Sequence, residues 1–245
     1  MKKIIIGILL FVSISAQSAT DIQGTVVPTR LMISLPEGFD FFYQDVEANV
    51  LKAIEVVRAN PIQENHLFDY KNLDLKVPRK VTIIATTAIN CPFESMIGGV
   101  LADGSAAVTA ATWDEGLKTQ EYFVFLFVDR IGYDVATISG LSMVSPSRGA
   151  LARYSLILGH EIYGHISYYL SMPPMLEIPT KKELESQELR ALKDGLRFGE
   201  AVLKSGKQSQ QEAIMFEKVL KEERTRTQMF EYQCSSYIQG DRNQN

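Results

Sequence analysis

Cysteine and histidine are scarce in this 245-residue chain, which has only two cysteines and three histidines. Cys91 and Cys234 allow one disulfide, which we expect in an oxidising compartment; the alternative is two buried thiols that never meet. Cys91 stands between Asn90 and Pro92, a context without the signature of a thiol nucleophile. The sequence therefore argues against cysteine-based catalysis.

An excess of positive charge is also missing. Lysine and arginine number 25 against 29 acidic residues, which gives a formal net charge of −4. Binding to nucleic acid requires clustered cations, so we expect no nucleic-acid partner. The apolar fraction of 46% and the charged fraction of 22% are ordinary for a globular protein, and they argue against disorder, collagen-like repeats and a polytopic membrane protein.

The apolar run at the N-terminus, residues 4–14, is shorter than the roughly 20 residues that a membrane-spanning helix needs. Two lysines precede this run and small residues follow it, an order typical of a secretory signal peptide over residues 1–19. An uncleaved anchor is the alternative. We expect an exported protein, periplasmic or secreted, whose mature form begins near Thr20 and has no stable membrane anchor.

Short runs of β-branched or apolar residues predict a small mixed sheet in the first part of the chain. Residues 80–86 (KVTIIAT) and 105–112 (SAAVTAAT) have the composition of strands, and the continuous apolar run 122–128 (YFVFLFV) is typical of a central buried strand. A helix is expected over 39–57, because its apolar residues recur with helical spacing. A long connection is expected over 63–79.

Helices are expected in the rest of the chain, over 145–170, 181–204 and 208–228. A sheet followed by helices indicates an α+β fold. We expect one domain over residues 20–245 with three parts: a sheet-containing part over about 20–144, an active-site helix over about 146–170, and a helical C-terminal part over about 180–238.

The helix expected over 145–170 contains the segment His160-Glu161-Ile162-Tyr163-Gly164-His165. Neutral imidazole nitrogens are good zinc ligands, and a glutamate beside them can act as general base. His66, the third histidine, lies in a polar stretch and is not counted as a ligand. The segment is therefore a candidate metal site.

The two histidines of this segment are five residues apart, whereas the familiar zinc motif spaces them by four. On a straight α-helix, residues five apart point about 140° away from each other and cannot share one ion. A π-bulge absorbs the extra residue, and such bulges are frequent at functional sites. Gly164 weakens the helix where this bulge is needed. We therefore predict a π-bulge between the histidines.

The segment resembles the His-Glu-x-x-Gly-His motif of the dipeptidyl peptidase III family of zinc peptidases. That family takes its third ligand from a Glu-Glu pair in a later helix, and Glu222-Glu223 is similar to that pair. The resemblance implies zinc on His160, His165 and Glu223, with Glu222 as the alternative ligand and Glu161 as general base. In length and expected export, the chain is more similar to the compact zincin domains of secreted bacterial effectors, which implies a zincin-like fold.

Two imidazoles and a carboxylate with one open position form a catalytic zinc set rather than a structural one. We therefore expect a zinc metallopeptidase that cleaves a peptide or protein substrate with a zinc-activated water, from which Glu161 takes a proton. Residues 105–112 are the candidate edge strand for an extended substrate. The candidate oxyanion donors are Tyr163, Arg224, Arg226 and Tyr232.

A function of another class stays open: a non-catalytic exported binding protein, or an inactive peptidase relative, that acts through its C-terminal helices. In that case both histidines are structural, and Glu222-Glu223 is a solvated helix face. A metzincin is excluded, because Ser171 stands where its third histidine would be. The sequence has no Gly-x-Ser-x-Gly, Walker or dinucleotide motif either. Zinc binding discriminates between the enzyme and the binding protein.

Overall fold

The structure is a computed structural model that describes residues 26–28, 46–62, 67–71, 73–75, 81–86, 105–114, 119–137, 146–171 and 180–242. Residues 1–19 lie outside these ranges, so the signal peptide stays a prediction. Cys91 and His66 lie outside them as well. Cys234 has a free thiol in the described part of the chain, and the disulfide expected to Cys91 stays a prediction because Cys91 is not described. Within the described ranges, no helix has both the length and the apolarity needed to cross a bilayer.

One mixed sheet has the strand order β1-β4-β6-β5. Its members are β1 (Val26–Pro28), β4 (Val81–Thr86), β6 (Thr119–Phe127) and β5 (Ala107–Asp114). The first three strands run parallel, and β5 pairs antiparallel with β6 at the edge. The strands predicted over 80–86, 105–112 and 122–128 are confirmed, and the third of them is an interior strand, as its continuous apolar run indicates.

A short antiparallel pair, β2 (Phe68–Asp69) and β3 (Asp74–Leu75), lies inside the stretch predicted as a connection. Between the two strands, Leu73 adopts a positive φ of 55° and is fully buried. The predicted long connection therefore contains a strand pair that the sequence did not indicate, because two-residue strands are too short to produce a visible alternation of apolar and polar residues.

The helices are α2 (Val46–Ala59), α4 (Val128–Thr137), α6 (Pro146–Gly159), η1 (His160–Ile166), α7 (Ser167–Ser171), α8 (Lys181–Ser205) and α9 (Gln210–Arg242). Thr180 and Glu183 form a capping box at the start of α8. Gly206 ends α8 with a φ of 62°, a conformation that favours glycine. Helix α4 was not predicted, and α9 ends at Arg242, beyond the helix predicted over 208–228 and close to the end at about 238 predicted for the helical C-terminal part.

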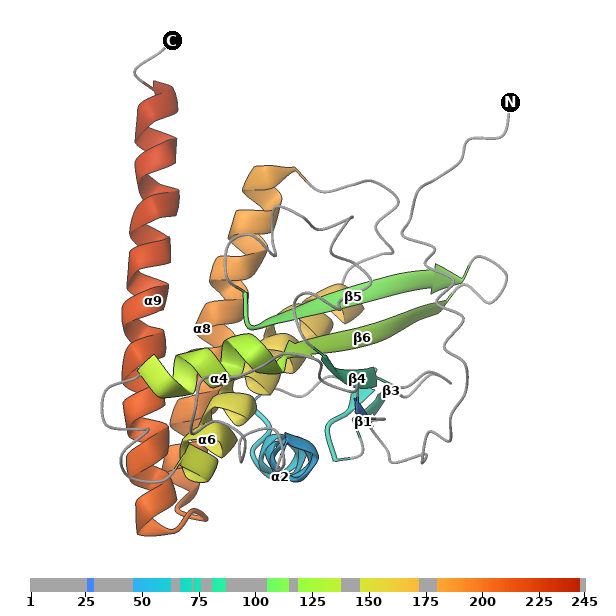
Figure 1. Cartoon of the computed structure of the whole chain (residues 1–245). Coiled ribbons are helices and arrows are strands. Elements are labelled where there is room, and N and C mark those ends of the chain that lie inside the picture. Colours follow the sequence, from blue (N-terminus) through green and yellow to red (C-terminus); the bar gives the residue numbers. More distant parts are fainter. Residues whose placement is uncertain are drawn as a thin grey trace.

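The sheet lies on one side of the molecule and α9 on the opposite side, with α6 and α8 between them (Figure 1). Helix α6 contacts α2, α4, α8 and α9, and it runs directly into η1 and α7. Tyr154, Leu158 and Phe198 are completely buried in the core around it. The α+β fold with a small mixed sheet is therefore confirmed, and its central helix is the one that carries the histidines.

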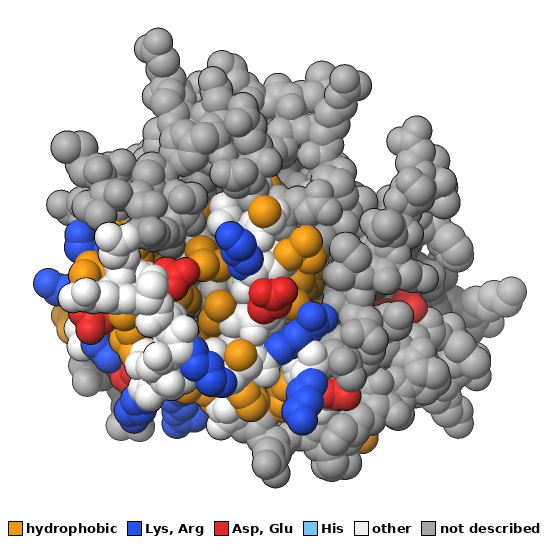
Figure 2. Space-filling view, turned by 90° about the horizontal axis from the view of Figure 1, so that it is seen from below, with side chains coloured by type: hydrophobic (Ala, Val, Ile, Leu, Met, Phe, Trp, Pro, Cys, Tyr) orange, Lys and Arg blue, Asp and Glu red, His pale blue; other side chains and the backbone are white. Residues whose placement is uncertain are grey.

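The face that looks downward in Figure 1 is shown as a surface in Figure 2. Hydrophobic side chains lie there among lysine, arginine and acidic side chains, and no histidine is visible among the described residues in this view. The side chains of His160 and His165 are each only 15% exposed. The histidines are therefore not part of this surface.

Candidate metal centre

A seven-residue π-helix, His160–Ile166, interrupts the α-helix at the predicted motif. At its end, the backbone N–H of Ser167 donates to the carbonyl oxygen of Ile162, five residues back. The hydroxyl of Ser167 donates to the same carbonyl at 3.2 Å, and Tyr70 bonds that hydroxyl at 2.9 Å. The predicted bulge is thus confirmed, and it extends over the whole motif rather than a single residue.

The π-helix turns the two histidines toward one another. Their rings meet edge to face with centroids 4.9 Å apart, and the Nε2 atoms of His160 and His165 are 3.1 Å apart. One candidate ligand atom from each of His160, Glu161 and His165 lies within 4.8 Å of the others. These three residues therefore form a cluster that could hold a metal ion.

A further carboxylate reaches this cluster from α8. Glu188 places Oε2 at 3.2 Å from Nε2 of His165 and Oε1 at 3.6 Å from Nε2 of His160. Glu188 was not identified from the sequence. It lies in a charged helix with several other glutamates, and no local pattern separates it from them.

Small residues allow α8 to pack close enough for Glu188 to reach the histidines. A Cβ atom at Gly164 would lie 2.5 Å from both Cα and Cβ of Ala191, and one at Gly195 would lie 3.1 Å from Cβ of His160. Contacts under 3.0 Å to backbone atoms cannot be relieved by a rotamer change. The glycine at position 164 is therefore required for this helix contact as well as tolerated by the π-helix.

The nitrogens of His160 and His165 and the carboxylate of Glu188 suit a zinc ion. Ligand atoms at about 2.0–2.1 Å from a tetrahedral zinc lie about 3.3–3.4 Å from one another. Nε2 of His160 and Nε2 of His165 are 3.1 Å apart, and the Glu188 carboxylate approaches both rings, with Oε2 at 3.2 Å from His165 and Oε1 at 3.6 Å from His160. Two imidazoles and one carboxylate also match the ligand types of catalytic zinc sites. The residues present therefore suit a divalent metal ion such as zinc.

Glu161 lies beside these donors and is almost fully buried, at 3% exposure. Its Oε1 is 3.9 Å from Nε2 of His160, and its Oε2 accepts a hydrogen bond of 2.6 Å from the hydroxyl of Thr109 on β5. The carboxylate thus has one oxygen bonded to the sheet and the other turned toward the histidines. That arrangement suits a base next to a metal-bound group.

The titratable groups of the cluster shift one another's pKa values. Burial lowers the pKa of His160, although the charges of Glu188 and Glu161 oppose this effect. Burial acts in the same direction on His165, but the hydrogen bond to Glu188 and the charges of Glu161 and Glu188 outweigh it and raise the pKa of His165. Burial would raise the pKa of Glu188, yet His160 and His165 lower it to about 2. Glu188 is therefore an anion at neutral pH, as a metal ligand must be.

Tyr169 is a further aromatic residue of this site that the sequence did not indicate. Its ring stacks on His165 with centroids 6.4 Å apart. Burial raises the pKa of Tyr169 to about 12, with smaller contributions from the charges of Glu161 and Glu188. The phenol is therefore protonated at neutral pH, and its hydroxyl lies 3.4 Å from Oε1 of Gln187.

The structure places Glu222 and Glu223 on α9, outside the cluster of His160, Glu161 and His165. Glu223 forms an ion pair with the buried guanidinium of Arg153, and its Oε1 is also 3.5 Å from Arg226. Glu222 contributes to the electrostatic environment of the same arginine. Neither belongs to the cluster of His160, Glu161 and His165. The glutamate pair of α9 therefore does not lie at the histidines, where Glu188 of α8 brings a second carboxylate besides Glu161.

Three of the four candidate oxyanion donors form hydrogen bonds to groups other than the histidines, and the fourth is exposed to solvent. Tyr163 is fully buried and donates to the carbonyl of Val57 at 2.8 Å. Arg224 and Arg226 bond Glu200 and Asp134, respectively. Tyr232 is 76% exposed on α9. The sequence identified these residues by type alone, and the structure gives each of them a different environment.

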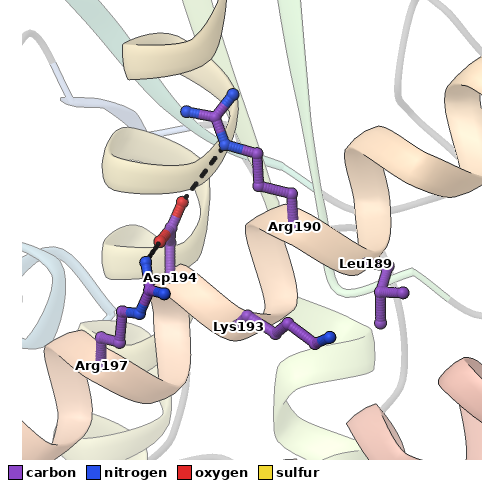
Figure 3. A pocket seen from close by; sticks show the side chains of 5 residues that line it. All are labelled: Leu189, Arg190, Lys193, Asp194 and Arg197. Atoms are coloured by element: carbon purple, nitrogen blue, oxygen red, sulfur yellow. Dashed lines mark hydrogen bonds and ion pairs between the residues drawn. The ribbon is translucent and has the colours of Figure 1, made fainter.

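A hollow of about 370 Å³ on α8 is a second place where polar side chains gather, lined by Leu189, Arg190, Lys193, Asp194 and Arg197. Arg190 and Arg197 both turn toward the carboxylate of Asp194 (Figure 3), at 3.7 and 2.9 Å. Lys193 pairs with Glu231 at 2.7 Å. Each cation of this hollow already has an acidic partner, so it is a weaker candidate for a functional site than the histidine cluster.

The comparisons with known proteins found no match to this chain. No protein-family model matches the chain, and neither does any curated protein or solved structure. The likeness to zinc peptidases therefore rests on the cluster of His160, Glu161 and His165 alone.

Proposed function

We propose that this protein is a zinc-dependent metallopeptidase that hydrolyses peptide bonds in a peptide or protein substrate. The observation that carries the proposal is the convergence of His160, His165 and Glu188, with the buried carboxylate of Glu161 beside them. Strand β5 supports the proposal as well, because it is an edge strand in contact with the π-helix.

His160, His165 and Glu188 would hold the zinc, which when bound supplies a Lewis acid for water and for the substrate carbonyl. Glu161 supplies the base. Its Oε1 accepts a proton from a water molecule while the water oxygen attacks the carbonyl carbon of the scissile peptide. Glu161 then delivers this proton to the departing nitrogen as the carbon–nitrogen bond breaks, which returns the carboxylate to its starting state.

Zinc content and hydrolysis, measured on the same preparations, test this proposal. We expect about one zinc per chain by elemental analysis, and loss of that zinc in His160→Ala and in His165→Ala. Glu161→Gln should keep the zinc and lose hydrolysis of fluorescein-labelled casein or of a mixed quenched-peptide library by a factor of about 10² to 10⁴. A folded wild type that takes up no zinc when zinc is supplied would contradict the proposal and leave a binding protein.

We also propose that the protein is exported, on the basis of the two lysines, the apolar run and the small residues within positions 1–19. Mass spectrometry of the protein recovered from the periplasm or medium of an expressing bacterium tests this. A mature N-terminus near Thr20 is expected, and an intact Met1 in a cell-retained protein would contradict it.

A further inference from the structure

Thr109 occupies an unusual place in the sheet. It pairs with Val124 on β6, which in turn pairs with Ile83 on β4, and both of these neighbours are completely buried. Directly paired residues of neighbouring strands point to the same face of a sheet. The row that faces the core thus reads isoleucine, valine and then threonine. A hydroxyl therefore stands at a position where the strand pattern calls for an apolar side chain.

The hydroxyl of Thr109 has one evident partner, the carboxylate of Glu161. The oxygens are 2.6 Å apart, which is the range of hydrogen bonds from a hydroxyl to an ionised carboxylate. Within the described part of the chain, no other hydrogen bond to this carboxylate is present. Because Glu161 is 3% exposed, loss of this bond would leave a buried oxygen without a partner.

We propose that Thr109 is a positioning residue for the reaction: its hydroxyl holds Oε2 of Glu161 so that Oε1 faces the histidines. This inference rests on the proposed function, in which Oε1 accepts the proton of water. The bond leaves Oε1 at 3.9 Å from Nε2 of His160, turned toward the site of attack. The side chain of Thr109 points to the core, whereas an extended substrate would pair with the backbone of the strand. Its loss should therefore lower kcat and leave KM nearly unchanged.

Thr109→Val removes the hydroxyl and keeps the shape, and Thr109→Ser keeps the hydroxyl. We expect Thr109→Val to retain about one zinc per chain and to lower kcat on labelled casein by about 10- to 100-fold, with KM within about twofold. Thr109→Ser should recover most of that loss. Thr82→Val is the matched control, because Thr82 pairs with Phe123 on the opposite face of the same sheet.

Crystal structures of the zinc-loaded wild type and Thr109→Val separate this inference from the proposed function. The Glu161 carboxylate should change position in Thr109→Val. This structural result can be obtained even if the wild type has no hydrolytic activity. Absence of wild-type activity would contradict the peptidase proposal but not the contact between Thr109 and Glu161. An unmoved carboxylate, a kcat no lower than that of Thr82→Val, or loss of zinc in Thr109→Val would each overturn the positioning role.

Discussion

At the scale of single residues, the carboxylate that serves as the third ligand beside the two histidines decides what the cluster can do. The positive charges and the hydrogen bond of the protonated histidines lower the pKa of Glu188, so this carboxylate is an anion that can attract a cation. Glu223 has a different partner, since its carboxylate pairs with the guanidinium of Arg153, whose side chain is only 4% exposed. A carboxylate that compensates a buried cation is not free to bind a metal as well.

Replacement of Glu188 by alanine is therefore expected to weaken zinc binding strongly. Removal of a residue that hydrogen-bonds a metal ligand typically lowers metal affinity by about 10- to 100-fold. Removal of the ligand itself should therefore lower zinc affinity by more than that. Isothermal titration with zinc measures the effect.

Glu222→Gln is the matched control for this variant, because Glu222 is the alternative ligand indicated by the sequence. We expect it to bind zinc as the wild type does. If Glu222→Gln lost the metal while Glu188→Ala kept it, the assignment of the third ligand to α8 would be wrong.

At the scale of elements, the site depends on the contact between the π-helix and α8. Gly164 and Ala191 leave no room for another carbon between these helices, and Gly195 packs on His160. The π-helix sets the direction of the histidines, and the close approach of α8 sets the reach of Glu188. The two helices therefore form the site together.

Gly164→Ala should force these two elements apart. Because the added Cβ would meet backbone atoms of α8 at 2.5 Å, we expect a loss of about 1–3 kcal/mol in the free energy of unfolding together with weaker zinc binding. Urea denaturation and zinc titration measure the two effects.

Gly206→Ala separates general destabilisation from an effect on the site. Gly206 has a positive φ, and nothing lies within 4 Å of a Cβ atom placed there, so an alanine costs stability through backbone strain rather than through a clash. It should leave zinc affinity unchanged. Equal losses of zinc affinity in both variants would show that Gly164 acts only through global stability.

The elements with strong local patterns could be predicted from the sequence, and those without them could not. The strand over 122–128 has a continuous apolar run, and the helix spacing of His160 and His165 required a π-type turn. Helix α4 follows β6 without an intervening residue, so no glycine or proline marks the change from strand to helix. Glu188 reaches its site through packing of α8, and a contact between two helices leaves no local trace in the sequence.

At the scale of the whole molecule, a network of charged side chains around the buried Arg153 joins α4, α6 and α9. Arg153 on α6 bonds Asp134 on α4 at 2.6 Å and also pairs with Glu223 on α9. Arg226 on α9 bonds both oxygens of Asp134, at 3.1 and 3.2 Å. The helix that leads into the metal centre is thereby connected to the long C-terminal helix through ionised groups, which makes the fold sensitive to acid.

The sign of this sensitivity follows from the pKa of Asp134. Burial would raise this pKa, but the charges and hydrogen bonds of Arg153 and Arg226 lower it below its usual value. An acid with a lower pKa in the folded state stabilises the fold fully above its unfolded pKa of about 3.9, and this contribution is lost as the pH falls toward the folded pKa.

Asp134→Asn should remove this contribution while Arg153 keeps Glu223 as a partner. At pH 7 we expect the variant to be less stable than the wild type by about 1–3 kcal/mol in urea denaturation. The difference should shrink as the pH is lowered below about 4, because only the wild type then loses the stabilising carboxylate. Glu200→Gln is the control, since its pair with Arg224 is exposed on both sides and should contribute little at any pH. A difference between Asp134→Asn and the wild type that stayed constant from pH 7 to pH 3 would show that the Asp134 charge does not stabilise the junction of α4, α6 and α9.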